Sequence, residues 1–187
     1  MDILYIYYFF EVINMDLKER TCCFFGHRDI EVTDELVNRI TKTVERLITD
    51  KDINTFLFGS RSDFDSICLK VVTELKKKYR NIVRIYVRAE FPYINEDYVN
   101  HLLKFYDYTY FPEHMINAGR AAYVERNHEM IDKSSFCVFY CDEYYISPEK
   151  ENVKRPTRYQ PRSGTKLAYD YAVKKEKQII NIKSINI

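Results

Sequence analysis

The sequence predicts an α/β fold in which a mainly parallel central sheet lies between two layers of helices. Short apolar runs alternate along the chain with longer segments whose apolar residues recur at helical spacing. No hairpin dipeptide such as Asn-Gly joins two of the apolar runs. The 187 residues suffice for one such domain with a sizeable core. Strands that alternate with helices need crossover connections, and these connections give parallel sheets covered on both faces.

Each element follows from a local pattern. Apolar runs bounded by turn-forming residues predict strands over 21–25, 55–58, 82–87, 108–110, 136–140 and 178–182. Amphipathic segments predict helices over 33–49, 64–79, 98–105, 118–133 and 166–175. Thr33 suits the N-cap of the first helix, and Asp34 and Glu35 suit its first turn.

Composition indicates a globular chain of nearly neutral charge. Apolar residues make up 46% and aromatic residues 16%, and the formal net charge is +1. This charge argues against both a membrane surface and nucleic acid as partners. The odd count of five cysteines suits buried thiols in a reducing cytoplasm. Cys137, Cys141 and His128 lie near one another in sequence but lack a second ligand pair, so we expect no metal and no cofactor.

The first fourteen residues stand apart from the rest. They are apolar and aromatic, lack a basic region and a cleavage site, and are too short to span a bilayer. Met15-Asp16 repeats the Met-Asp start just before the first strand. We expect residues 1–14 to form an appendage, or the product of an upstream start, and residues 15–187 to form a single domain.

Polar loops follow the first two strands, at the positions where α/β proteins hold ligands. The first loop carries Gly26, His27 and Arg28, where the glycine would allow close approach of a ligand and the arginine could pair with phosphate. The second opens a helix and carries Gly59, Ser60, Arg61, Asp63 and Asp65. Its serines could bind phosphate, and either aspartate could bind a ribose. The alternatives are a solvated turn for the first loop and plain helix capping by Ser62 or Asp63 for the second.

Two further polar groups come later in the chain. Arg126 and Asn127 lie on the helix before the strand over 136–140, where the arginine is either an anchor for an anionic ligand or a surface residue. Ser163, Gly164 and Thr165 open the last helix after a polar loop. The end of that loop is basic, and it could cover an anionic ligand, contact nucleic acid or remain solvated; its cations are Lys154, Arg155, Arg158, Arg162 and Lys166.

In their order and spacing, these motifs resemble the YpsA-like branch of the SLOG superfamily, which joins the DNA-processing protein DprA to the Lonely Guy (LOG) phosphoribohydrolases. The resemblance covers about residues 21–182 and implies a Rossmann-like fold with a site for a nucleotide or a nucleotide-derived ligand. Arg126 matches the arginine of the LOG motif, and Gly164-Thr165 matches its Gly-Thr pair. Leu167 and Ala168 stand where the LOG enzymes carry glutamates.

Three functions remain open from the sequence. The first is a binding or sensing module for a nucleotide-derived small molecule, located in the cytoplasm, with homo-oligomerisation left open. The second is an N-glycosidic hydrolase of nucleoside phosphates, which the missing glutamates disfavour, although Asp63, Asp65 and Glu125 could supply a carboxylate. The third is single-stranded DNA binding like that of DprA, disfavoured by the net charge and favoured only by the basic run over 154–166.

Overall fold

The protein folds around one six-stranded sheet in which all strands are parallel, in the order β4-β3-β2-β1-β5-β6. A computed structural model describes residues 16–59, 62–89, 96–115, 119–142, 145 and 163–184. The strands are β1 (Thr21–Gly26), β2 (Thr55–Phe58), β3 (Val83–Val87), β4 (Tyr108–Tyr110), β5 (Phe136–Tyr140) and β6 (Gln178–Asn181). The predicted α/β fold with a parallel central sheet is confirmed.

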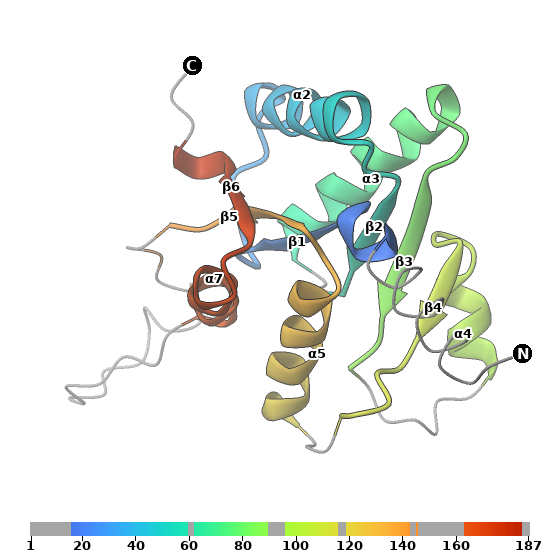
Figure 1. Ribbon diagram of the computed structural model, residues 1–187, viewed down its shortest axis with the longest axis vertical. Helices are drawn as coiled ribbons and strands as arrows, with labels where there is room; N and C mark the ends of the chain where they lie inside the picture. Colours follow the sequence, from blue (N-terminus) through green and yellow to red (C-terminus); the bar gives the residue numbers. More distant parts are fainter. Residues whose placement is uncertain are drawn as a thin grey trace, which may run out of the picture.

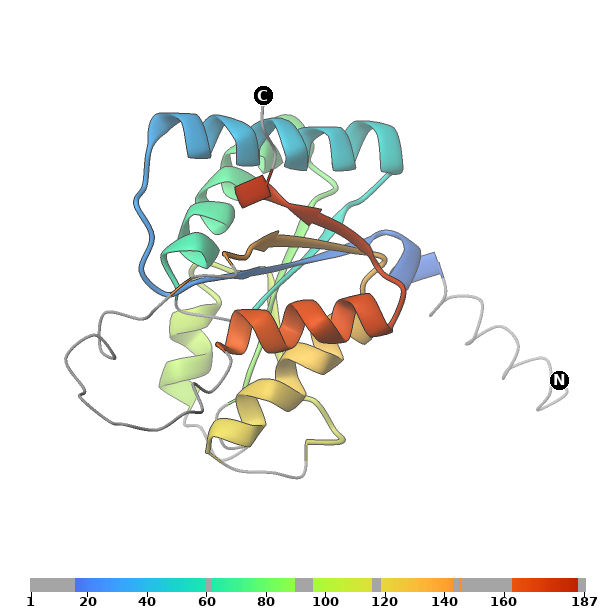
Figure 2. The same cartoon turned by 90° about the vertical axis from the view of Figure 1, so that its left-hand side faces the viewer.

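Helices cover both faces of the sheet, which gives three layers (Figures 1 and 2). Two long helices, α2 (Asp34–Lys51) and α3 (Asp63–Lys78), lie on one face. The opposite face carries α5 (Arg120–Asp132) and α7 (Gly164–Lys174), which lie below the sheet in Figure 2. The short helix α4 (Glu96–Leu102) precedes β4, and the short 3-10 helix η1 (Ile182–Ser184) follows β6.

The first long helix begins and ends where its sequence dictates. Thr33 adopts an extended conformation, and its hydroxyl accepts a hydrogen bond from the Leu36 backbone N–H at 3.2 Å. Asp34 and Glu35 place negative charge against the positive end of the helix dipole. Asp52 then turns into the left-handed region with φ of 54°, which ends the helix.

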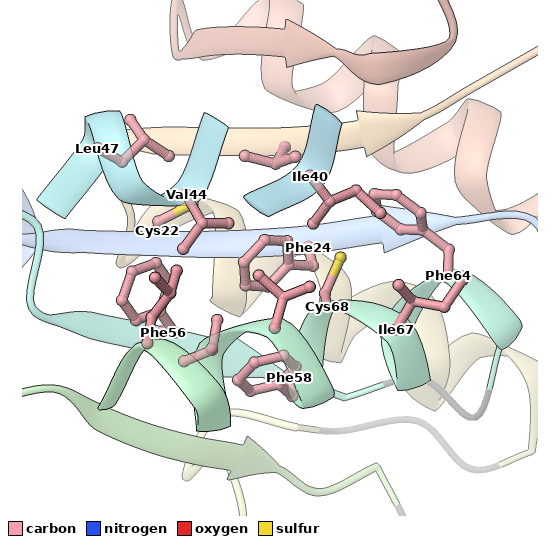
Figure 3. Close-up of a cluster of buried hydrophobic side chains, with 14 of the residues drawn as sticks. Cys22, Phe24, Ile40, Val44, Leu47, Phe56, Phe58, Phe64, Ile67 and Cys68 are labelled. Atoms are coloured by element: carbon pink, nitrogen blue, oxygen red, sulfur yellow. The ribbon is translucent and has the colours of Figure 1, made fainter. Parts of the chain in front are cut away.

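Alternation along the strands divides the core into two clusters. In β1, Cys22 and Phe24 belong to the cluster under α2 and α3, which Figure 3 shows with Phe56 and Phe58. Cys23 and Phe25 belong to the cluster under α5 and α7. A strand with both faces covered must be apolar throughout, and this explains why β1 is a continuous apolar run.

The strand order reverses at β1, and this reversal positions the site. The chain moves from β1 through β2 and β3 to β4, and then returns to place β5 on the other side of β1. The connection that leaves β1 leads to α2 on one face of the sheet, and the connection that leaves β5 leads to α7 on the other. Open α/β sheets bind their ligands near such a reversal, at the carboxyl edge of the sheet. Because all six strands are parallel, every loop that follows a strand lies at this same edge.

Several sequence-based expectations fall outside the described residues. The appendage over 1–14, Ser60, Arg61 and most of the basic run over 154–166 belong to this part of the chain. None of the described helices is long and apolar enough to cross a membrane. All five cysteines are free and buried.

Candidate functional site

The carboxyl edge of the sheet brings together the loop after β1, the loop after β5 and the beginning of α7. Gly26 pairs in register with Tyr140, so the last residues of the two strands lie side by side. The helix α7 begins at Gly164, and Lys166 in its first turn lines a cavity together with Cys141 and Asp142, which follow β5. Because all strands are parallel, the loops that leave β1, β2 and β5 begin at this same edge.

His27 is buried rather than part of a solvated loop, with only 2% of its surface exposed. Its Nε2 accepts a hydrogen bond from the Asp142 backbone N–H at 2.9 Å, which ties the loop after β1 to the loop after β5. The imidazole also stacks on the Tyr145 ring with centroids 3.7 Å apart. Burial lowers the pKa of His27, and the neutral form is the one that can accept this bond. No pattern in the sequence points to Tyr145 as its partner.

The glycine that ends β1 has a packing role. A Cβ built on Gly26 would lie 2.3 Å from the Cβ of Phe64, far inside van der Waals contact. Phe64 is fully buried at the start of α3, so the space that we had expected a ligand to use is filled by the chain itself. The Arg28 side chain is exposed, and its backbone carbonyl accepts a hydrogen bond from the Asp63 N–H at 2.8 Å.

The second glycine is likewise enclosed. A Cβ on Gly59 would lie 2.7 Å from Cδ and 2.8 Å from Nε of Arg126, and 2.9 Å from Sδ of Met130. In the turn that follows, Ser62 accepts a hydrogen bond from the Asp65 N–H at 3.1 Å and caps α3, as the capping alternative predicts. Asp65 is 2% exposed, whereas Asp63 is exposed and its carboxylate accepts a bond from the Ile30 N–H at 3.3 Å.

Arg126 is not a surface residue, because the structure leaves only 4% of it exposed. One guanidinium nitrogen donates a hydrogen bond to the Gly59 carbonyl, and Nε donates to Oδ1 of Asn127 at 3.1 Å. The guanidinium also lies 5.5 Å from the centre of the Tyr123 ring. Arg126 thus ties α5 to the end of β2, and no ligand is needed to explain its burial.

The beginning of α7 keeps its expected cap. The Ser163 hydroxyl accepts a hydrogen bond from the Lys166 N–H at 3.1 Å. Gly164 is exposed with open space around it, and Thr165 is buried at 9% exposure. The first turn holds no acidic residue, whereas α2, α3 and α4 each carry two. The positive end of the α7 dipole is therefore not offset by its own helix.

A cavity of about 280 Å³ opens beside α7, at the ends of β5 and β6. It is lined by Cys141, Asp142, Lys166, Tyr169, Asn181, Lys183 and Ser184. Sequence reasoning named only Lys166 among these residues as a candidate for ligand contact. The sequence could have pointed to four of these residues by their position after strands, because Cys141 and Asp142 directly follow β5, and Lys183 and Ser184 closely follow β6.

Both lysines of the cavity have a carboxylate beside them. Nζ of Lys166 lies 3.0 Å from Oδ1 of Asp170, one helical turn further along α7. Nζ of Lys183 lies 3.4 Å from Oδ2 of Asp142. The nearby Tyr140 raises the pKa of Lys183 and Asp142 adds to the rise, and together they outweigh the opposite effect of burial. Asn181 holds the backbone at the end of β5 in place, since its side chain accepts a hydrogen bond from the N–H of Cys141 and donates one to its carbonyl.

Within the described part of the chain, no group of three or more His, Cys, Asp or Glu side chains could hold a metal ion. Of the carboxylates that could serve glycoside hydrolysis, Asp65 is buried in α3, and Asp63 accepts a hydrogen bond from a backbone N–H. Leu167 and Ala168 occupy the first turns of α7, where neither can act as an acid or a base.

Comparison with solved structures shows the fold. DNA processing protein A (DprA) from Streptococcus pneumoniae aligns with 87% of this chain and 50% of its own, with a TM-score of 0.52 and 11% identity. DNA processing protein A from Helicobacter pylori, described as binding single-stranded DNA, aligns with 89% of this chain and 66% of its own, with a TM-score of 0.52 and 14% identity. The chain thus spans between half and two thirds of these proteins. No protein-family model and no curated protein matches its sequence.

The comparison corrects the expectation that nucleic acid is not a partner. That expectation rested on the net charge of +1, yet a protein with this fold binds single-stranded DNA. Net charge sums over all faces of a molecule, whereas phosphate contacts depend on cations gathered on one surface. A near-neutral chain can therefore carry a basic edge, and the expectation drawn from net charge was wrong.

Proposed function

We propose that this chain binds single-stranded nucleic acid along the carboxyl edge of its sheet, and that it belongs to the SLOG superfamily that its motifs resemble. The observation that carries the proposal is its structural similarity to a DNA processing protein that binds single-stranded DNA. The strand order reverses at β1, and parallel α/β sheets hold their ligands at the carboxyl ends of the strands beside such a reversal.

The cations of this edge support the proposal. Arg28 is exposed directly after β1, Lys166 lies in the first turn of α7, and Lys183 follows β6. In the sequence, the basic run that ends at Arg162 immediately precedes the Ser163 cap of α7. A strand of phosphates attracts cations arranged along one edge, and the unneutralised beginning of α7 adds to this attraction.

A nucleotide-sized ligand and a nucleic acid strand share the same phosphate chemistry, so the nucleotide-binding interpretation of the motifs is narrowed rather than discarded. No comparison favours a small-molecule sensor as the main role. LOG-type hydrolysis is not proposed, because the matched positions hold Leu167 and Ala168.

The test is fluorescence anisotropy with a labelled oligothymidylate and with a duplex of equal length, measured across a range of salt. We expect the single strand to bind, with an affinity that falls as salt rises. Arg28→Ala combined with Lys166→Ala should weaken binding and reduce the salt slope by roughly 0.7 for each phosphate that the protein no longer neutralises.

A matched control removes two lysines from the opposite edge. Lys77 and Lys78 lie at the end of α3, are largely exposed, and pair with Glu74 and Glu45 respectively. Lys77→Ala combined with Lys78→Ala changes the net charge by the same amount as the edge variant. Equal weakening in both double variants would mean that only overall charge matters, and an absence of single-strand binding would remove the proposal.

A further inference from the structure

The cavity between α7 and the ends of β5 and β6 contains groups of both charge signs, and this limits the ligands that fit it. Lys166 and Lys183 supply ammonium groups, and Asp142 supplies a carboxylate. A simple anion would meet the Asp142 carboxylate as well as the lysines. A ligand that presents acceptors to the lysines and donors to the aspartate can bond all three groups.

Within the lining of the cavity, Lys183 and Asp142 form an ion pair, and their separation sets the spacing between the acceptors and the donors of such a ligand. Nζ of Lys183 and Oδ2 of Asp142 are 3.4 Å apart, which is an ion pair but longer than an N–H···O hydrogen bond. An ammonium has three N–H donors and a carboxylate has about four acceptor positions, so a ligand can share both groups with the partners that they already have. The Asp142 backbone is held by its bond to His27, which fixes where this side chain begins.

We infer that the cavity takes a guanine base. Guanine presents a carbonyl acceptor next to two adjacent N–H donors on one edge, and no other common base places two donors there. The carbonyl and the ring nitrogen beside it suit the lysines, as in the contacts of lysine with guanine in DNA grooves. The two N–H donors suit the two oxygens of Asp142. A volume of about 280 Å³ leaves room for one base with part of its sugar.

The inference rests on the proposed function in one respect, since the guanine can belong either to a bound strand or to a free nucleotide. Both sources offer the same base edge to Asp142 and the lysines. Calorimetry with guanosine, inosine and adenosine 5′-monophosphates tests the free nucleotide. Anisotropy with oligothymidylates that carry one central guanine, hypoxanthine or adenine tests the strand.

In at least one of these two arms, we expect guanine to bind about ten- to a hundredfold more tightly than adenine, the range that a hydrogen bond to a charged group supplies. Hypoxanthine lacks the second donor and should fall between them. Asp142→Asn should abolish the preference for guanine. Asp170→Asn makes the same change of charge beside Lys166, at a residue that does not line the cavity, and should leave the preference intact.

The outcomes separate the two proposals. Preference for guanine among the nucleotides without any strand binding would support the cavity assignment and remove the proposed function. Strand binding with equal affinity for guanine and adenine, together with equal affinity for the nucleotides, would keep the proposed function and overturn the guanine site. A preference that survives Asp142→Asn would also overturn it. Circular dichroism of both variants checks that the fold is intact.

Discussion

The contact between Gly59 and Arg126 gives the sharpest test of how this edge is built. A methyl group added at Gly59 would lie 2.7 Å from Cδ and 2.8 Å from Nε of Arg126. Arg126 cannot swing away freely, because one end bonds the Gly59 carbonyl and Nε bonds Asn127. Overpacking of this kind costs about 1–3 kcal/mol, and the anchored arginine favours the upper half of that range.

The same geometry predicts that truncation of the arginine relieves the clash. Arg126→Ala alone should cost about 2–4 kcal/mol, since it removes a hydrogen bond from a charged donor and empties buried space. In that background Gly59→Ala should cost less than in the wild type, because its methyl group enters the vacated volume and only Sδ of Met130, 2.9 Å away, must still shift. The double variant should therefore be more stable than the sum of the single changes predicts, by about 1–2 kcal/mol.

Urea unfolding followed by circular dichroism measures all four proteins of this cycle, and an unchanged m-value keeps the free energies comparable. Gly164→Ala is the matched control, because open space surrounds that glycine at the first position of α7. It should be neutral or slightly stabilising, since alanine is favoured in a helix. A neutral Gly59→Ala, or equal costs in the two backgrounds, would refute the packing argument.

Two further predictions concern ionisable groups away from the cavity. Asp107 is partly buried, and burial alone would raise its pKa, but bonds from Arg84 and Lys76 hold the pKa well below its usual range. Asp107→Asn should therefore lower the free energy of unfolding by about 2 kcal/mol at neutral pH. The difference from the wild type, measured by urea unfolding, should shrink as pH falls below about 4. Because burial lowers the pKa of His27, the wild type should lose stability as pH falls below about 6.5, when the unfolded chain binds the proton first. His27→Phe should lose the share of this dependence that His27 contributes, whereas His128, whose pKa burial also lowers, keeps its own share. The variant should cost about 1–2 kcal/mol, because the Asp142 N–H loses its acceptor; a parallel pH profile in both proteins would contradict this.

The strands, the helices and their caps could be predicted because each depends on a local pattern. An apolar run such as that of β1 has few alternatives to a buried strand, and Thr33 and Ser62 each cap the helix that begins at the next residue. The shared edge of the polar loops follows from the same patterns, since a parallel sheet gathers the end of every strand on one side.

The roles of individual site residues could not be predicted, because they depend on contacts between distant parts of the chain. Gly59 and Arg126 are 67 positions apart, and His27 and Asp142 are 115 apart. A glycine after a strand is equally suited to a ligand and to a side chain of another helix, and only the fold decides between them. The same holds for an arginine, which serves an anion or a backbone carbonyl with the same donors.

Because the motif residues pack against the chain itself, ligand contacts are expected at other residues. The side chains of Phe64 and Arg126 occupy the space beside Gly26 and Gly59, so no ligand can approach the backbone closely at these glycines. Arg126 cannot report on binding by itself, because its removal breaks a tie between α5 and β2 and weakens the fold whether or not a ligand is present. The side chains that reach the cavity come instead from α7 and from the residues that follow β5 and β6. A residue whose removal changes ligand affinity while leaving the unfolding curve in place is therefore to be sought among Asp142 and Lys183, where a charge can be removed without emptying the core.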